Sequence, residues 1–296
     1  MRRLIQKFLP IAFLRLIKRR ILKSYYSGRE YRCPFCLRRF RKFMPSGLKE
    51  AVLSEKQVIG AGRRINSKCP HCYANERERL IYLYLKEKTG LLYKDINVLD
   101  IGPSKQIMKA LTSLRNINYI GGDKYPEHIR QYNDLPGIIE LDVLNMPFSD
   151  NSFDIVICSH VIDEVEDDVE GMREIRRVLK PDGIAIIQSP IAYGLDKTIE
   201  KFDATAEERK KLFGNECYIR LYSRDDYVQR LEKAGFTVST YNFFDDDEFG
   251  RDFVRANALH ATEDLYIVTK VKNAQLSNET AASVSAETAT DTLANL

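Results

Sequence analysis

The sequence predicts an α/β protein whose main domain contains a mostly parallel sheet with an antiparallel last strand. Short apolar segments alternate with amphipathic ones between residues 96 and 190, which is typical of strands joined by helices. A hydrophobic fraction of 44% in 296 residues is sufficient for one substantial core. Two Cys-x-x-Cys pairs precede this region and predict a small N-terminal zinc-ribbon-like module.

The charge of the chain is divided unevenly along its length. The net charge is +4 overall, yet about fourteen Lys and Arg face one acid within residues 1–43, roughly +13 there and −9 elsewhere. A basic N-terminal region on an acidic body indicates contact with an anionic surface such as RNA, lipid or an acidic glycan, or a region that is simply solvated.

Residues 1–23 place apolar side chains at roughly helical spacing among Arg and Lys, and we expect a basic amphipathic helix over 1–24. The apolar run from Phe8 to Leu14 is too short to cross a bilayer. We therefore predict peripheral membrane contact, with a packing helix or a targeting peptide as the alternatives. No small-residue cleavage site follows, which disfavours cleavage. The expected location is the cytoplasm, at the inner membrane face in the first case.

The cysteines predict a structural zinc site in a reducing compartment. Cys33-Pro-Phe-Cys36 and Cys69-Pro-His-Cys72 each direct two thiolates toward one ion, and four thiolates complete a closed tetrahedral site. We expect residues 44–66 to be looped out and His71 to point away from the metal. The alternatives are reduced thiol pairs or one redox-active pair.

A basic and aromatic run, residues 38–43, follows the first cysteine pair. Its arginines and Phe40 and Phe43 suit contact with phosphates and stacking on bases. The alternative interpretation is an exposed basic turn over a small apolar patch.

The expected elements of the main domain follow from caps and periodicity. Asn75 caps a first helix that ends near Gly90. Further helices are expected at 104–114, 126–132, 166–180, 206–213 and 223–234, the third of them stopped by Pro181-Asp182-Gly183. Strands are expected at 96–101, 118–122, 137–142, 153–159, 183–189, 236–241 and 264–271.

The predicted organisation is therefore a basic helix (1–24), a zinc-binding module (25–74), a main α/β domain (75–272) and a disordered tail (273–296). The tail is rich in Ala, Ser, Thr and Glu and lacks the large apolar residues that a packed segment needs. Cys158 lies in an apolar run and is expected to be a buried thiol.

Polar residues follow four of the predicted strands, where an open α/β sheet binds its ligand. Asp123 is placed to accept hydrogen bonds from ribose hydroxyls, and Asp142 to receive an adenine amine. The loop after Asp100 carries Gly102 but neither a full glycine triplet nor a P-loop lysine, so no phosphate cradle is present. A ligand with adenine and ribose but no phosphate fits, and S-adenosyl-L-methionine is such a ligand.

Residues 96–190 resemble the class I S-adenosylmethionine-dependent methyltransferases of the type 11 group, which share a Rossmann-like sheet. The matching segments are VLDIGPS, YIGGDKYPE, LDVLNMPFSDNSFDIVICSHVIDEVEDD and EIRRVLKPDGIAIIQSP. The whole chain also resembles bacterial methyltransferases with a leading two-knuckle zinc module, some of which accompany surface-polysaccharide genes. The cofactor-binding residues that this resemblance implies are Asp100, Gly102, Ser104, Asp123, Asp142, Val143, Ser159 and His160.

The chain departs from the family pattern in three places. Ser104 replaces the second glycine of the first loop, Glu164 replaces a histidine, and the histidine that similar sequences carry near Tyr218 is absent. The candidates for a catalytic base are His160, Asp163 and Glu164, although His160 is also interpreted as packing against the cofactor and the two acids as starting the next helix. Arg220 and Tyr222 are candidates for contact with an anionic or sugar substrate, or ordinary surface residues.

Three functions compete at this stage. The first is methyl transfer to a small-molecule or glycan acceptor at the membrane surface. The second is methylation of an rRNA base, against which the acidic main domain argues. The third is a non-catalytic zinc-containing scaffold that keeps the methyltransferase fold.

Overall fold

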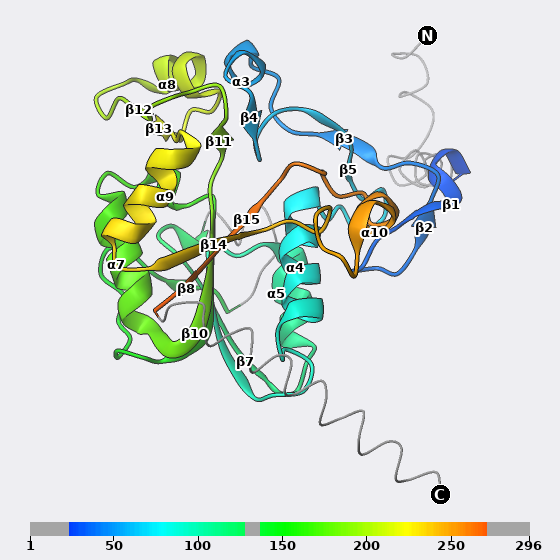
Figure 1. The fold of residues 1–296 in the computed structure, drawn as a ribbon, viewed down its shortest axis with the longest axis horizontal. Coiled ribbons are helices and arrows are strands. Elements are labelled where there is room, and N and C mark those ends of the chain that lie inside the picture. The colour runs from blue at the N-terminus through cyan, green and yellow to red at the C-terminus, as the bar shows by residue number, and fades with distance from the viewer. Residues whose placement is uncertain (1–23, 128–136, 271–296) are drawn as a thin grey trace, which may run out of the picture.

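The computed structural model describes residues 24–127 and 137–270. A seven-stranded sheet lies at its centre (Figure 1). The strands lie in the order β14 (Thr237–Tyr241), β15 (Leu265–Thr269), β10 (Leu179–Gln188), β9 (Phe153–Ser159), β6 (Ile96–Ile101), β7 (Ile117–Asp123) and β8 (Ile139–Glu140). The strands from β8 to β10 pair in parallel, and β15 pairs antiparallel with both β10 and β14. The predicted fold class and its antiparallel last strand are confirmed.

Alternate residues of the central strands face two separate cores. Leu99 and Cys158 point to the core under α7 (Asp168–Val178) and α9 (Arg224–Lys233), and Cys158 is fully buried as expected. Val98 and Ile157 point to the other core, under α4 (Glu76–Lys88) and α5 (Lys105–Thr112). The sheet is thus covered on both faces, as the buried apolar strands require (Figure 1).

The first helix begins as expected. The Asn75 side chain accepts from the Glu78 N–H while the Glu78 carboxylate accepts from the Asn75 N–H, which forms a capping box at the start of α4. The helix ends at Lys88, with Thr89 as its C-cap.

Several expected elements are shorter or shifted. The helix expected at 166–180 ends at Val178, and Leu179 already pairs with Phe153 as the first residue of β10. A register shift between Leu179 and Ile184 accommodates the Pro-Asp-Gly segment within the strand. The strand expected at 137–142 is reduced to β8, and most of the helix expected at 126–132 lies outside the described residues.

The expectation that residues 44–66 form a loop is wrong. They contain β3 (Met44–Ser46), α3 (Ala51–Glu55), β4 (Val58–Ile59) and the start of β5 (Arg64–Lys68). Strand β4 pairs with β11 (Ile191–Ala192), and Leu53 and Val58 pack with Phe213 in a small separate core. This segment is therefore ordered because it contributes apolar side chains to a shared core.

The segment between β10 and α9 completes that core. It contains β12 (Ile199–Glu200), α8 (Ala206–Phe213) and β13 (Arg220–Leu221), and β12 pairs with β13. A short 3-10 turn, η1 (Ile162–Glu164), follows β9.

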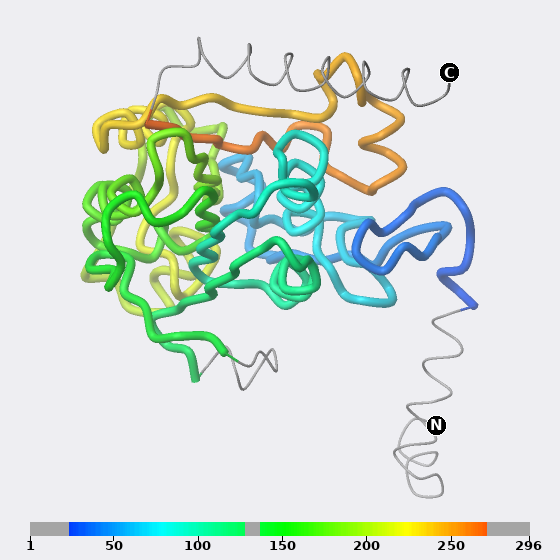
Figure 2. Tube along the Cα trace, turned by 90° about the horizontal axis from the view of Figure 1, so that it is seen from below, coloured from blue at the N-terminus to red at the C-terminus, as the bar shows by residue number. Residues whose placement is uncertain are grey.

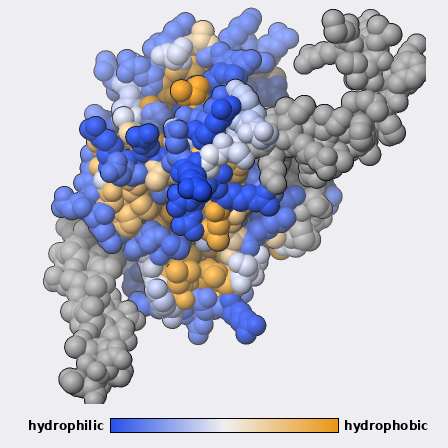
Figure 3. Space-filling model, turned by 90° about the vertical axis from the view of Figure 1, so that its right-hand side faces the viewer, coloured by the Kyte–Doolittle hydropathy of each residue, from blue (hydrophilic) through white to orange (hydrophobic). Residues whose placement is uncertain are grey.

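The N-terminal cysteine module lies at one end of the molecule (Figure 2). It consists of β1 (Ser27–Arg32), paired with β2 (Arg39–Phe40), and of β3 paired with β5. Helix α10 (Gly250–Ala256) packs beside β1. The face on this side is mostly hydrophilic and carries separate apolar patches (Figure 3).

The basic helix and the tail expected at the two ends fall on residues 1–23 and 271–296, outside the described residues. Among the described helices, none has the length and apolar character needed to cross a membrane.

Candidate functional site

A cavity of about 1340 Å³ opens at the carboxyl ends of β6, β7 and β9, and it extends to the cysteine module. Strand β6 is the point at which the chain order of the sheet reverses, with β7 on one side and β9 on the other. In open α/β sheets this position binds the ligand. The predicted cofactor residues that line it are Gly102, Ser104, Asp123, Asp142, Val143, Ser159 and His160.

The first loop is shaped by Gly102 and Ser104. Gly102 has a φ of +69°, and a Cβ at this position would lie 2.6 Å from a methyl carbon of Val161. Only glycine fits this conformation and this close approach. Ser104 occupies the place of the second family glycine because it caps α5, its hydroxyl accepting from the Ile107 N–H at 3.3 Å.

The two expected cofactor carboxylates lie at the ends of neighbouring strands. The Asp123 side chain accepts from the Tyr125 N–H at 2.7 Å. Asp142 accepts from the Leu144 N–H at 3.0 Å and pairs with Lys124 at 2.8 Å, and this lysine lowers the pKa of Asp142. Both carboxylates are therefore held in place by short local contacts and border the cavity.

Asp100 lies behind the cavity wall. Its side chain is 2% exposed and accepts the hydroxyl of Tyr119 at 2.8 Å, and it is not among the residues that line the cavity. Burial raises the pKa of Asp100 to about 7. The geometry gives Asp100 a supporting place behind the Gly102 loop.

His160 is held by two partners that the sequence did not indicate. Its backbone has a φ of +58°, Arg77 donates to its Nε2, and its Nδ1 lies 3.1 Å from the Tyr218 hydroxyl. Burial lowers the pKa of His160 well below its usual value, and Arg77 and Arg64 add to the effect. Because arginine only donates, His160 is neutral with its proton on Nδ1, and its Nε2 lone pair is already used.

The remaining two base candidates differ in access. Asp163 is 1% exposed, accepts from the Ser189 hydroxyl at 3.0 Å and does not line the cavity. Glu164 borders the cavity, where desolvation and the carboxylates of Asp163 and Asp123 raise its pKa to about 8. Glu164 is therefore the acid in η1 that a bound molecule reaches.

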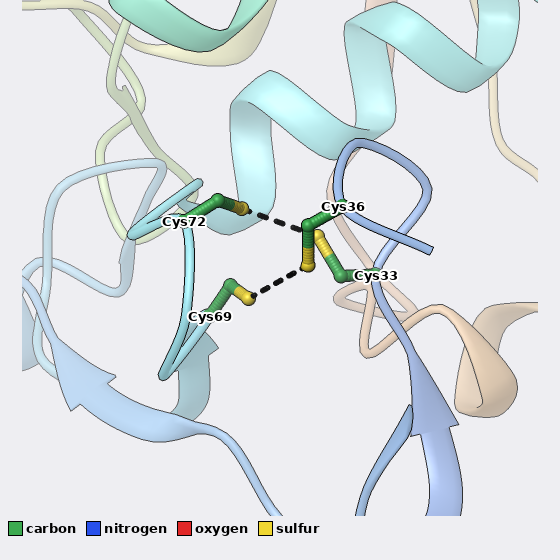
Figure 4. A group of neighbouring side chains, drawn as sticks. All are labelled: Cys33, Cys36, Cys69 and Cys72. Carbon is green, nitrogen blue, oxygen red and sulfur yellow. Dashed lines mark hydrogen bonds between the residues drawn. The ribbon is translucent and has the colours of Figure 1, made fainter. Parts of the chain in front are cut away.

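The two cysteine pairs meet in the module, and their sulfur atoms all lie within 4.8 Å of one another (Figure 4). The Cys33 and Cys72 sulfurs are 3.5 Å apart, and those of Cys36 and Cys69 are 3.8 Å apart. This donor set fits a tetrahedral site for a soft metal ion. His71 is exposed and is not part of the cluster.

The two cysteine turns have matching backbones. The N–H groups of Leu37 and Tyr73 donate to the carbonyls of the first cysteines, Cys33 and Cys69, and both donors have positive φ values. The fourth residue after each first cysteine thus closes the turn and directs both thiols inward.

Arg79 joins the module to the main domain. This residue is fully buried in α4, and its guanidinium donates to the carbonyls of Ser67, Ala74, Asn257 and Ala258. The ring of Phe43 lies 4.6 Å from the same group. One buried cation therefore connects both sides of the second cysteine turn to the segment after α10.

A second, half-buried cation, Arg64, binds across the same junction. Its Nε lies 2.6 Å from a Glu76 carboxylate oxygen, and its Nη1 lies 3.4 Å from Glu263. Burial raises the pKa of Glu76 to about 7. On the other side of the turn, Gln106 of α5 donates to the carbonyl of Cys72, so the module contacts the helix that follows the Gly102 loop.

The interpretation of Arg220 and Tyr222 as substrate-contacting or surface residues is wrong. Arg220 is 1% exposed and donates to Glu200 and to the carbonyls of Ile162 and Glu166. The Tyr222 hydroxyl donates to Asp168 at 2.7 Å from a fully buried position. Both residues hold η1 in place through the core instead.

Base stacking by the basic run is likewise contradicted. Phe40 and Phe43 are 7% and 2% exposed and pack inside the module with Tyr26. Arg41 lies over the ring of Tyr25 at 4.7 Å. The alternative, an exposed basic turn over an apolar patch, is confirmed.

Residues 99–187 match the model of a family described as a methyltransferase domain. This part of the chain is therefore a methyltransferase domain. A demethylmenaquinone methyltransferase from Staphylococcus epidermidis is 32% identical over 98 residues, which are 33% of this chain and 30% of that protein. A cycloartenol-C-24-methyltransferase from Oryza sativa subsp. japonica is 32% identical over 109 residues, 35% of this chain and 32% of that protein.

The chain thus matches about a third of the length of these curated relatives. Among solved structures, one complex of the Haloferax volcanii Trm112 methyltransferase activator with a putative methyltransferase is 18% identical, covering 67% of this chain and 94% of that one, with a TM-score of 0.41. The cyclase SpnF is 17% identical, covering 64% and 79%, with a TM-score of 0.43.

Proposed function

We propose that this protein transfers a methyl group from S-adenosylmethionine to a small-molecule or glycan acceptor. The observation that carries the proposal is that Asp123 and Asp142 both line one cavity. The neighbouring Gly102 loop lacks the glycine triplet and the lysine that would bind a phosphate. The match of residues 99–187 to a methyltransferase domain supports it independently.

The residues of the cavity fit this cofactor. Asp123 would accept hydrogen bonds from the ribose hydroxyls, and Asp142 would accept from the adenine amine beside Val143. Ser159 lines the cavity, and its hydroxyl has no hydrogen-bond partner among the described residues. When bound, the cofactor supplies an electrophilic methyl group on a sulfonium.

The remaining work of the site is positioning and proton removal. His160 stays neutral and packs against the cofactor, because Arg77 uses its Nε2 lone pair. Glu164 reaches the cavity and is the residue we assign to take a proton from an acceptor that must lose one. Its raised pKa places that step in the range where general bases are effective near neutral pH.

We further propose that the four cysteines hold a structural Zn²⁺. All four tetrahedral positions would be filled by thiolates, which leaves no open position for catalysis. The ion would fix the second cysteine turn. Arg79 of α4 and Gln106 of α5 donate hydrogen bonds to carbonyls of that turn, so the ion would also stabilise the positions of both helices.

A small acceptor is favoured over RNA for two reasons. The aromatic rings of the basic run are buried in the module, so they cannot stack on bases. The curated relatives named above act on a quinone and a sterol, which are small molecules. Peripheral contact with a membrane through residues 1–23 remains part of this proposal.

Calorimetric titration with S-adenosylhomocysteine tests the cofactor assignment. We expect micromolar binding to the zinc-loaded protein and a loss of about ten- to a hundredfold in Asp123→Ala, because a charged hydrogen-bond acceptor is removed. Asp196→Ala, which changes an exposed aspartate away from the cavity, is the control and should bind like the wild type. Absence of binding to a folded wild-type protein would overturn the proposal in favour of a scaffold.

A further inference from the structure

The half of the cavity formed by the module and α5 carries positive charge. Lys68 precedes the second cysteine turn, and Lys105 and Lys109 lie four residues apart on one face of α5. Within the described residues, none of these three lysines forms an ion pair with a carboxylate. Lys124, in the cofactor half, is by contrast paired with Asp142.

The acids of the cavity are located at its other end. Asp123, Asp142, Glu164 and Glu166 line the half at the strand ends. Glu78 is the acid nearest the module among the lining residues, and its carboxylate already accepts from the Asn75 N–H at 2.6 Å. The cavity therefore has an acidic end suited to a cationic cofactor and a more basic end, where Glu78 is the one lining carboxylate among the described residues.

An aromatic surface accompanies the lysines. Tyr73 closes the second cysteine turn with a φ of +66°, is 53% exposed and lines the cavity. The Lys68 ammonium lies 5.7 Å from the centre of its ring. Phe35 and Tyr82 stack on each other at 4.7 Å along the same wall.

We propose that the methyl acceptor carries an anionic group, a phosphate or a carboxylate, attached to a ring. Lys68, Lys105 and Lys109 would bind the anion, and Tyr73 would pack against the ring. This inference rests on the proposed methyltransferase function and assigns the cysteine module a part in acceptor recognition.

The arrangement favours a compact anion over a long nucleic acid. The three lysines line the same cavity as the proposed cofactor residues, so an acceptor bound to them would share that cavity with the cofactor. The anion can belong to a soluble molecule or to a lipid headgroup, and the two sources require separate measurements.

Phenyl phosphate is the probe for the soluble case, with phenol as its uncharged match. We expect phenyl phosphate to bind zinc-loaded protein saturated with S-adenosylhomocysteine and to bind about tenfold more weakly to Lys68→Gln and to Lys109→Gln. Lys233→Gln, an exposed lysine of α9, is the control and should bind like the wild type. Phenol should bind far more weakly to all four proteins.

The lipid case uses vesicles of phosphatidylcholine with one third phosphatidylinositol, whose headgroup phosphate is attached to a ring. Vesicle binding that falls in the same two lysine variants would assign the anion to a headgroup and supports the proposal. Because Lys68 adjoins a cysteine ligand, zinc content is measured for each variant, and Lys109→Gln gives the result free of that effect.

The proposal is overturned if neither phenyl phosphate nor the vesicles distinguish the lysine variants from Lys233→Gln. Binding of S-adenosylhomocysteine, measured first on each sample, separates this failure from that of the proposed function. If S-adenosylhomocysteine binds, and the lysine variants bind the anions as well as Lys233→Gln does, the methyltransferase assignment stands and the proposal of an anionic acceptor is wrong. Binding of a single-stranded RNA oligonucleotide that depends on the same lysines, without phenyl phosphate binding, would also overturn it.

Discussion

The two ends of the cavity are built in different ways. At the cofactor end, Gly102, Asp123 and Ser159 follow directly from hydrogen-bonded strands, so the sheet itself fixes their positions. At the module end, Lys68 ends the short strand β5 and Tyr73 closes the second cysteine turn, beside the four thiols and the carbonyls that Arg79 binds. The first end is stabilised by a large apolar core, whereas the second contains four thiols that could hold a metal ion and one buried cation.

This contrast indicates how one chain combines a fixed task with a variable one. Under the proposed function, cofactor recognition would lie on the sheet, where the same carboxylates could serve any acceptor. Acceptor recognition would lie on the cysteine module, which can change without disturbing the strands. The predictions below test whether the ends depend on different forces.

Loss of the metal ion should have the largest effect. Cys69→Ser removes one of four thiolates, and structural zinc contributes on the order of 10 kcal/mol to small domains. We expect zinc loss, exposure of the module to proteolysis and a large fall in melting temperature. Metal analysis and limited proteolysis measure this, with Cys217→Ser, an exposed thiol outside the cluster, as the unaffected control. Equal zinc content in the two variants would contradict the assignment.

Removal of the buried cation should come next. Arg79→Met leaves four backbone carbonyls without their donor, and we expect a loss of about 3–5 kcal/mol in the free energy of unfolding. Chemical denaturation measures it. Arg115→Met, at an exposed position, should change stability by less than about 0.5 kcal/mol. Similar stabilities for the two variants would show that the module does not depend on Arg79.

The pH dependence of stability tests the cofactor end. Burial raises the pKa of Asp100 to about 7 in the folded protein, above its usual value, so the folded state binds this proton more tightly. Its contribution to stability is therefore fully present below about pH 4 and is lost as the pH rises through 7, by at most about 4 kcal/mol. Asp100→Asn cannot ionise and should flatten the fall in unfolding free energy between pH 4 and pH 7. An unchanged slope would contradict this account.

The Gly102 loop should show the smallest of these effects. Gly102→Ala combines a positive φ with a clash against Val161, and we expect a loss of about 1–3 kcal/mol and weaker cofactor binding. Gly250→Ala shares the positive φ, but open space surrounds the new methyl group. The difference in unfolding free energy between the two variants gives the cost of the clash with Val161. Equal losses in the two variants would show that this clash costs nothing.

The sequence predicted what depends on local chemistry. The strand-end acids, the Asn75 cap and the cysteine turns follow from short patterns that the structure reproduces. Arg77 and Tyr218 could not be found in this way, because their contacts with His160 join residues 83 and 58 positions apart. Arg220 misled the prediction because a buried arginine that binds backbone carbonyls has the same sequence appearance as one on the surface.

The segment at 44–66 was missed for a related reason. Its strands are two or three residues long, and its apolar residues Leu53 and Val58 bury themselves only against a distant part of the chain. Short elements of this kind carry no periodic signal of their own.

Amide hydrogen exchange with and without S-adenosylhomocysteine tests the central claim most directly, because it reports where the ligand acts. The account predicts slower exchange at the strand ends, in residues 101–107, 120–125, 141–145 and 158–165, and little change in β1 and β2 of the module. Protection confined to the module, or none in a sample that binds the ligand, would contradict the assignment of the cofactor to the strand ends.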